Sequence, residues 1–345
     1  MTEIVAGFGT SHGPQLKASP PEAWETRGVA DRRSKGLKFR GGTYSFEELK
    51  ALREDFSAEI THDVMQRRWD SCQASMDELS RFIADQDVDV LVIISSDHKE
   101  TYGDEWLAPF SVFWGDEVAH VPYTQAQLDE MAPGLAEAAM GDVPDRTVMR
   151  PTHRALGKHI IQSTQADDFD TGATEVIPAG RYENHTIPHG FGFIYQRFLG
   201  QESTIPMVPI FINTFWEPNP PSAKRCYDFG RAVGRAIQSF PGDLRVGVVA
   251  SGGLSHFVID EKLDTEFIQA MKDHDAEYLS SVPAGEMMSG ASELRNWIAV
   301  AGIADEVGLG VTNVDYEPCY RTEAGTGNAM GFLTWERNAG ERNAR

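Results

Sequence analysis

The sequence predicts an α/β fold: a single domain with a central mixed sheet flanked by helices, and a site at the carboxyl ends of the strands. Short Val/Ile/Leu-rich runs, typical of buried strands, alternate along the chain with amphipathic helical stretches. Three of these runs lead into a turn that carries a histidine, namely His12, His98 and His256. Open α/β sheets bind ligands at the carboxyl ends of their strands, so three imidazoles at one edge predict a metal or acid–base site.

The first third of the chain contains two such strands. One is predicted over 3–11, before His12, and the other over 88–95, before Asp97 and His98. Residues 17–45 are polar and rich in Pro, Gly and Arg, which predicts either a functional cover loop or disorder. Apolar residues then recur at three-to-four spacing, so helical structure is expected over 46–86.

The rest of the chain continues the alternation, around one turn-rich segment at 183–193. The expected strands are 110–113, 207–212, 244–250 and 329–335, and the expected helices are 125–139, 153–164, 222–239, 263–279 and 291–303. Since no repeat or low-complexity linker interrupts the pattern, we expect one domain over 1–345.

Composition excludes several classes of partner. The 345 residues include 52 Asp and Glu against 31 Lys and Arg, a formal charge of −21. Such acidity disfavours nucleic acid and anionic membranes as partners. No apolar run approaches the ~20 residues of a bilayer span, and no signal-peptide pattern is seen. Three scattered cysteines do not form a disulfide framework, so a cytoplasmic location is expected.

His12 and His98 are candidate metal ligands, because neutral imidazoles with one carboxylate are typical of non-haem Fe(II) oxygenases. Asp97 is the candidate for accepting the second ring N–H of a ligating histidine. For either histidine alone, a structural role in a tight turn is the commoner alternative.

Glu293 is a candidate carboxylate ligand. It precedes Trp297 by one turn on an apolar stripe that includes Leu294 and Ile298. A carboxylate on a core-facing stripe must be paired, protonated or bound to metal. The alternative is an ordinary glutamate in a first helical turn, where the macrodipole stabilises it, and helix periodicity alone favours that alternative.

Two further histidines are candidates for acid–base work. His256 follows Gly252-Gly253, a pair that permits close backbone approach to a ligand. His189 lies between Pro188 and Gly190, with Phe191 as a candidate wall for an aromatic substrate. His185 competes with His189 for this role. The sequence lacks a Walker A motif, a Gly-x-Ser-x-Gly elbow and a His-Glu-x-x-His motif, which disfavours phosphate-binding, serine hydrolase and zinc protease functions.

An ordered set of motifs carries a family resemblance. The segments are 10–14 (TSHGP), 92–98 (VIISSDH), 188–190 (PHG), 208–214 (VPIFINT), 221–226 (PSAKRC), 251–256 (SGGLSH) and 289–297 (SGASELRNW). Through them the chain resembles the class III extradiol ring-cleavage dioxygenases, the family typified by the catalytic subunit of protocatechuate 4,5-dioxygenase. The resemblance covers most of residues 1–335, with an extra segment at about 17–60.

The resemblance implies that His12, His98 and Glu293 bind Fe(II). It further implies that His256 is the acid–base residue and that His189 contacts the substrate, although the chain has Pro188 where the family often has Asp. The implied reaction is cleavage by O2 of a small aromatic diol, such as protocatechuate, gallate or 3-O-methylgallate, in the catabolism of lignin-derived aromatics. A homo-oligomer of two or more subunits is expected, and a separate small lid subunit stays open.

Other functions stay open as well. His/His/Glu is also a zinc ligand set, so a zinc-dependent hydrolase or a zinc-dependent relative is the alternative enzyme. A binding protein with an inactive site is the non-enzymatic alternative. The extra segment carries six basic residues that either cover the site and attract an aromatic carboxylate or form an exposed basic loop: Arg27, Arg32, Arg33, Lys35, Lys38 and Arg40.

Overall fold

Four parallel strands form the centre of the sheet. In the computed structural model, which describes residues 1–337, they lie in the order β1 (Glu3–Thr10), β10 (Arg245–Ser251), β4 (Val90–Ser96) and β9 (Met207–Ile212). Strands β4 and β9 are buried along their whole length, which explains why both are continuous apolar runs in the sequence.

Further strands make the sheet mixed. β13 (Thr326–Glu336) pairs antiparallel with β1, and β11 (His256–Val258) and β12 (Gly310–Tyr320) pair antiparallel with β13. Beyond β9 follow an antiparallel β5 (Phe110–Phe113) and then β8 (Gly172–Thr174), which is parallel to β5. Two hairpins lie outside the sheet, β2 (Leu37–Phe39) with β3 (Gly42–Tyr44) and β6 (Glu117–His120) with β7 (Val148–Pro151).

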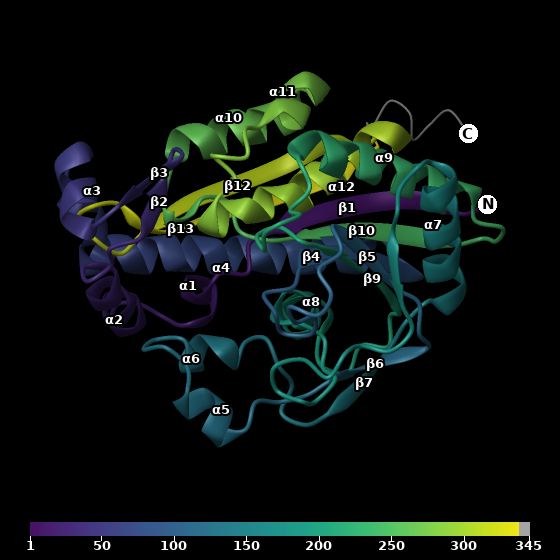
Figure 1. The fold of residues 1–345 in the computed structure, drawn as a ribbon, viewed down its shortest axis with the longest axis horizontal. Helices are drawn as coiled ribbons and strands as arrows, with labels where there is room; N and C mark the ends of the chain where they lie inside the picture. The colour runs from purple at the N-terminus through teal and green to yellow at the C-terminus, as the bar shows by residue number, and fades with distance from the viewer. Residues whose placement is uncertain (338–345) are drawn as a thin grey trace.

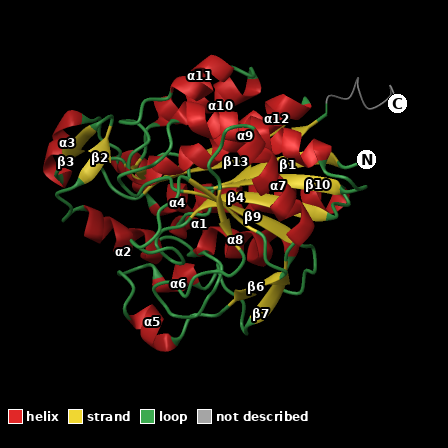
Figure 2. Cartoon of the chain, turned by 45° about the vertical axis from the view of Figure 1, so that its right-hand side comes forward, coloured by secondary structure: helices red, strands yellow, loops and turns green. Residues whose placement is uncertain are grey.

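Helices cover both faces of this sheet (Figure 1, Figure 2). One face carries α7 (Arg154–Ala166), α9 (Ala223–Ser239), α10 (Glu261–Lys272), α11 (Ala276–Ser281) and α12 (Leu294–Val307). The other face carries α4 (His62–Asp85) and α8 (His189–Ile194), and around it lie α1 (Pro14–Lys17), α2 (Glu22–Asp31), α3 (Phe46–Leu52), α5 (Gln125–Asp129) and α6 (Ala136–Ala139). The predicted α/β fold with a helix-flanked mixed sheet is therefore confirmed.

Some element predictions were wrong in detail. Residues 17–45 form helix and hairpin rather than an irregular loop. The helix predicted over 125–139 is two short helices interrupted at Pro133-Gly134, since proline and glycine end helices. The helix predicted over 263–279 is also divided, because the Asp275 side chain caps a new helix by accepting from the Tyr278 N–H at 2.9 Å.

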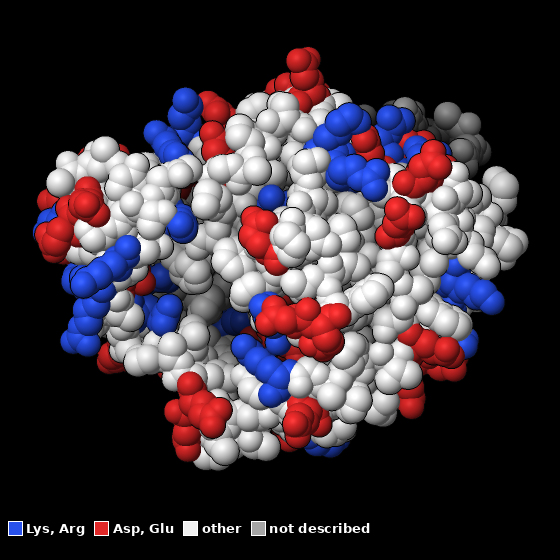
Figure 3. Space-filling view, viewed as in Figure 1, with Lys and Arg blue, Asp and Glu red and all other residues white. Residues whose placement is uncertain are grey.

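Among residues 1–337, no helix is both long and apolar enough to cross a bilayer. On the face shown in Figure 3, Lys and Arg side chains are interspersed with Asp and Glu rather than gathered into one basic surface.

Candidate metal and acid–base site

Strand register brings the predicted histidines to one edge of the sheet. Thr10 of β1 lies beside Ser251 of β10, and the neighbouring Ala250 lies beside Ile94 of β4. His12 and His98 each come two residues after the end of their strand, so both lie at the carboxyl edge of the sheet. His256 comes five residues after β10, at the start of β11. The site at the strand carboxyl ends therefore follows from the parallel order of β1, β10 and β4.

Glu293 reaches this edge from the opposite direction, as the last residue of the short helix η3 (Ser289–Glu293) directly before α12. The first turn of α12 is tied to the loop after β10, because Trp297 Nε1 donates to the Gly252 carbonyl at 2.8 Å. Asn296 Nδ2 likewise donates to the Ser251 carbonyl at 3.0 Å. Glu293, whose side chain is 2% exposed, is thereby held over the strand ends.

The Glu293 carboxylate is the centre of the cluster. Its Oε1 lies 2.9 Å from His98 Nε2 and 3.4 Å from His12 Nε2, and its Oε2 lies 3.9 Å from His256 Nε2. Burial alone would raise the pKa of this carboxyl, but the adjoining His12 and His98 rings hold it well below its usual value. Glu293 is therefore an ionised carboxylate inside the protein.

Hydrogen bonds define which nitrogen of His12 is free. The Ser251 hydroxyl donates to the Gly190 carbonyl at 2.7 Å, so toward His12 Nδ1, 2.9 Å away, it acts as the acceptor. His12 Nδ1 then carries the proton, and Nε2 presents a lone pair to Glu293. Burial lowers the pKa of His12 to about 4, in agreement with a neutral ring.

This arrangement fits a bound cation. His12 Nε2 and an ionised Glu293 oxygen face each other across 3.4 Å. His12 Nε2 and His98 Nε2 lie 3.4 Å and 2.9 Å from the same Glu293 oxygen, so these three side chains would hold a cation together. Ser96 Oγ also lies 3.2 Å from His98 Nε2. Among residues 1–337, no group of three or more His, Cys, Asp and Glu side chains is arranged so that it could hold a metal ion as it stands. The fit therefore rests on the chemistry of the donors, two imidazoles and one carboxylate.

His189 lies against the proposed ligands. Its ring centroid is 4.7 Å from that of His12 and 5.5 Å from that of His98. Glu100 holds it twice, through a short contact to Nδ1 and through the backbone N–H, which donates to Glu100 Oε2 at 2.7 Å. Burial lowers the pKa of His189, but the facing Glu100 carboxylate outweighs burial and raises it to about 8. With Nδ1 committed to Glu100, Nε2 is the nitrogen available to a ligand.

His256, unlike His189, is held in its neutral form. Its Nδ1 donates to the Leu254 carbonyl at 2.7 Å, which leaves a lone pair on Nε2, the nitrogen that faces Glu293. Burial lowers the pKa of this histidine, so the ring is neutral. A Cβ on Gly290 would lie 2.0 Å from His256 Cδ2, so only glycine at position 290 leaves room for the ring.

The residue before His256 is anchored by a buried acid on α10. Asp264 accepts hydrogen bonds from the Ser255 N–H at 2.9 Å, the Ser255 hydroxyl at 2.6 Å and the Tyr316 hydroxyl at 2.9 Å. Asp264 is fully buried, and burial raises its pKa from 3.8 to about 7, with a further contribution from the charge of Asp260.

This raised pKa predicts a pH-dependent stability. The folded protein binds the Asp264 proton more tightly than the unfolded chain, so this contribution is full below about pH 4 and is lost as the pH rises to about 7. Relative to Asp264→Asn, the free energy of unfolding of the metal-free protein should therefore fall by about 2–4 kcal/mol across this window. Urea unfolding of both proteins from pH 4 to 8 measures it, and a pH-independent difference would contradict the prediction.

Three other predicted site residues lie elsewhere or act differently. His185 is exposed and bonds the Ile177 carbonyl at 2.8 Å, away from the cluster. Phe191 is fully buried against Phe211 in the core, so it offers no wall to a substrate. The Asp97 carboxylate accepts the backbone N–H groups of residues 100, 101 and 102, so it shapes the loop after His98 instead of orienting a histidine ring.

Sequence reasoning missed the residues that support the cluster. Ser251 orients His12, Ser96 donates to Glu293 Oε1 at 2.9 Å, and Glu100 holds His189. The Gly253 N–H also donates to Glu293 Oε2 at 2.6 Å. Ser96 and Ser251 end β4 and β10, so serine at the end of a strand that precedes a histidine turn was the available signal.

Comparison with known proteins finds a matching family model. Residues 59–327 match the family model described as the catalytic LigB subunit of aromatic ring-opening dioxygenase. This match includes His98, His189, His256 and Glu293, whereas His12 and the β2–β3 hairpin precede it.

Three curated relatives are named as dioxygenases. The chain is 32% identical over 164 residues to a gallate dioxygenase of Pseudomonas putida, covering 44% of this chain and 45% of that protein. It is 30% identical over 195 residues to a 2,3-dihydroxyphenylpropionate/2,3-dihydroxicinnamic acid 1,2-dioxygenase of a Rhodococcus species, covering 56% and 52%. The protein of that name from Rhodococcus jostii is 28% identical over 195 residues, with the same shares. The chain thus spans about half the length of the curated relatives that it matches.

Proposed function

Because this chain belongs to the family of catalytic LigB subunits of aromatic ring-opening dioxygenases, we propose that it opens the ring of a catecholic aromatic acid with O2. The observation that carries the proposal is the convergence of three imidazoles on the buried Glu293 carboxylate, with His189 alongside. The similarity to a gallate and a dihydroxyphenylpropionate dioxygenase supports a diol that bears a carboxylate. Protocatechuate, gallate and 3-O-methylgallate are the candidate substrates.

The residues that would hold the metal are His12, His98 and Glu293. Two neutral imidazoles and one carboxylate are the ligand set of non-haem Fe(II) oxygenases, and we propose Fe(II) as the metal. When bound, Fe(II) orients the diol beside O2 and lowers the pKa of a phenolic hydroxyl.

His256 is placed to act first as a base. Its Nε2 carries a lone pair on the side of the cluster, because Nδ1 is committed to the Leu254 carbonyl. It would accept a proton from a substrate hydroxyl, and the resulting imidazolium, next to Glu293, would return a proton as the ring opens.

His189 would act as a hydrogen-bond donor. Glu100 holds its ring in place and favours the protonated form, so Nε2–H can donate to an oxygen of the substrate or of O2. Donation from a fixed position stabilises negative charge that develops on those oxygens during the reaction. The two histidines thus divide the work, His256 moving protons and His189 stabilising charge.

Oxygen consumption tests the proposal. The protein is loaded anaerobically with Fe(II) and then mixed with catechol, protocatechuate, gallate or 3-O-methylgallate in aerated buffer. We expect O2 uptake in equal molar amount to an acid diol, together with the absorbance of a ring-opened product. The same preparation of Glu293→Gln serves as the control, with uptake at background. No uptake with any diol would overturn the proposal, and metal analysis that then finds zinc would favour a hydrolase.

A further inference from the structure

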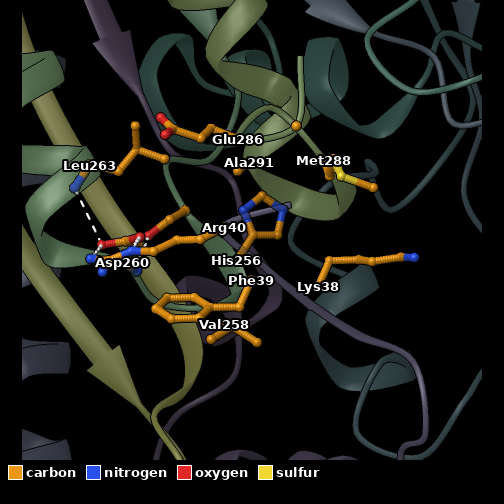
Figure 4. A pocket seen from close by; sticks show the side chains of 12 residues that line it. Lys38, Phe39, Arg40, His256, Val258, Asp260, Leu263, Glu286, Met288 and Ala291 are labelled. Atoms are coloured by element: carbon orange, nitrogen blue, oxygen red, sulfur yellow. Dashed lines mark hydrogen bonds and ion pairs between the residues drawn. The ribbon is translucent and has the colours of Figure 1, made fainter. Parts of the chain in front are cut away.

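A hollow that is open to solvent lies directly beside His256 (Figure 4). One wall comes from the segment after β10 and includes Ser255 and His256, and another from residues 285–291. The third wall is the β2–β3 hairpin, which contributes Lys38, Phe39 and Arg40. Because His256 Nε2 faces Glu293, a substrate at the cluster would extend its ring substituents into this hollow.

The hairpin is fixed in position. Arg40 makes two bonds to the Asp260 carboxylate, Nε to Oδ2 at 2.6 Å and Nη2 to Oδ1 at 2.8 Å. Arg53 lies 4.7 Å from the centre of the Phe39 ring and donates to the Ile259 carbonyl at 2.8 Å. Such bidentate and stacked contacts of arginine restrain both partners. Phe39 and Arg40 therefore meet the hollow at defined positions.

Lys38 is the cation of this wall that is not neutralised. The charge of Arg40 is matched by Asp260, whereas Lys38 Nζ bonds the uncharged Thr43 hydroxyl at 2.6 Å. Within the described part of the chain, no carboxylate forms an ion pair with Lys38. In a protein with a net charge of −21, a lysine that lines the hollow without an acidic partner is an attractive site for an anionic group.

Glu286, an acid on the other side of the hollow, favours one orientation of a bound substrate. Figure 4 shows Glu286 and Lys38 on opposite sides of the His256 ring. A negatively charged substituent would be repelled from Glu286 and attracted to Lys38. One orientation of an aromatic acid is thus favoured over the reverse.

We infer that Lys38 is the specificity residue for the acid group of the substrate. Its ammonium binds the ring carboxylate while the adjacent hydroxyls lie at Glu293 and His256. The inference rests on the proposed ring-opening function and adds the residue that distinguishes an aromatic acid from a neutral catechol.

The test compares each acid with its uncharged amide. Steady-state O2 uptake is measured for the acid that turns over fastest and for its primary amide, with the wild type, Lys38→Met and Lys38→Arg. Lys35→Met, an exposed cation of the same segment outside the hollow, is the matched control. We expect Lys38→Met to lower kcat/KM for the acid about 10- to 100-fold through KM, as for loss of a charge-assisted hydrogen bond. The amide should change less than about twofold on the same grounds. Lys38→Arg should retain most of the activity, and Lys35→Met all of it.

A binding measurement separates this inference from the proposed function. Gallate and its amide are titrated anaerobically into the wild type and Lys38→Met by calorimetry, which requires no turnover. Weaker binding of gallate alone in Lys38→Met supports the carboxylate site even if no diol is oxidised. Equal losses for acid and amide, unchanged binding of the acid, or no binding of gallate to the wild type would overturn it.

Discussion

Replacing His12 with alanine is expected to abolish retention of Fe(II) while the protein still folds. His12 is buried and its Nε2 presents a lone pair to Glu293 across 3.4 Å, so alanine at this position removes one of the three groups that would hold the metal. Replacing a residue that only hydrogen-bonds to a metal ligand weakens metal binding about 10- to 100-fold. Replacing a ligand itself should therefore lower the affinity for Fe(II) at least about 100-fold. Iron is measured after anaerobic loading and desalting, and folding by circular dichroism.

Two further variants make the result unambiguous. Glu293→Gln keeps the size of the side chain but removes its charge, and it should also lose iron, which avoids the cavity that alanine leaves at position 12. His185→Ala is the control, because His185 is exposed and bonds only a backbone carbonyl. Full iron occupancy in folded His12→Ala would remove His12 from the ligand set.

The central strands were predictable because their burial is visible in composition. β4 and β9 are buried on both faces and contain almost uninterrupted apolar residues. β12 lacked such a signal, since most of its residues are only half-buried and Pro318 lies within it. Proline is tolerated on edge strands, and β12 pairs only with β13, so tertiary context and not local preference makes it a strand.

Helix α8 was not predicted from the sequence, because tertiary packing and not local preference makes it a helix. Its sequence, HGFGFI, resembles a turn because glycine disfavours helices. A Cβ on Gly190 would lie 2.2 Å from Ser95 Oγ, and one on Gly192 would lie 2.3 Å from the Asp142 carbonyl oxygen. Both glycines are present because the helix packs closely against its neighbours, and a single sequence does not reveal this.

The site was predictable where strand order alone decides position. His12 and His98 follow β1 and β4, which both pair in parallel with β10, so the two histidines meet at the same edge of the sheet. Glu293 could not be distinguished by periodicity from a glutamate in a first helical turn, and only the family resemblance identified it. Ser251 and Glu100 act through contacts between segments distant in sequence, which no local pattern encodes.

Replacing His256 with phenylalanine is expected to preserve iron and substrate binding and to remove turnover. His256 Nε2 lies 3.9 Å from Glu293, farther than the nitrogens of His12 and His98, so the ligand set should stay complete without it. The ring lies against the bare backbone of Gly290, and phenylalanine has a similar flat shape to occupy that space. Loss of a general acid–base group should lower kcat about 100- to 10,000-fold.

The measurements separate proton transfer from a structural effect. Iron content and anaerobic binding of the acid substrate should match the wild type, whereas O2 uptake should be close to background. His159→Phe on α7 is the control, since that ring bonds Ser239 and Ser163, far along the chain from the cluster, and it should retain full activity. If His256→Phe consumed O2 at a near-normal rate, the proton would have to be taken by another group. His189 would not serve, because Glu100 favours its protonated form and leaves it a donor.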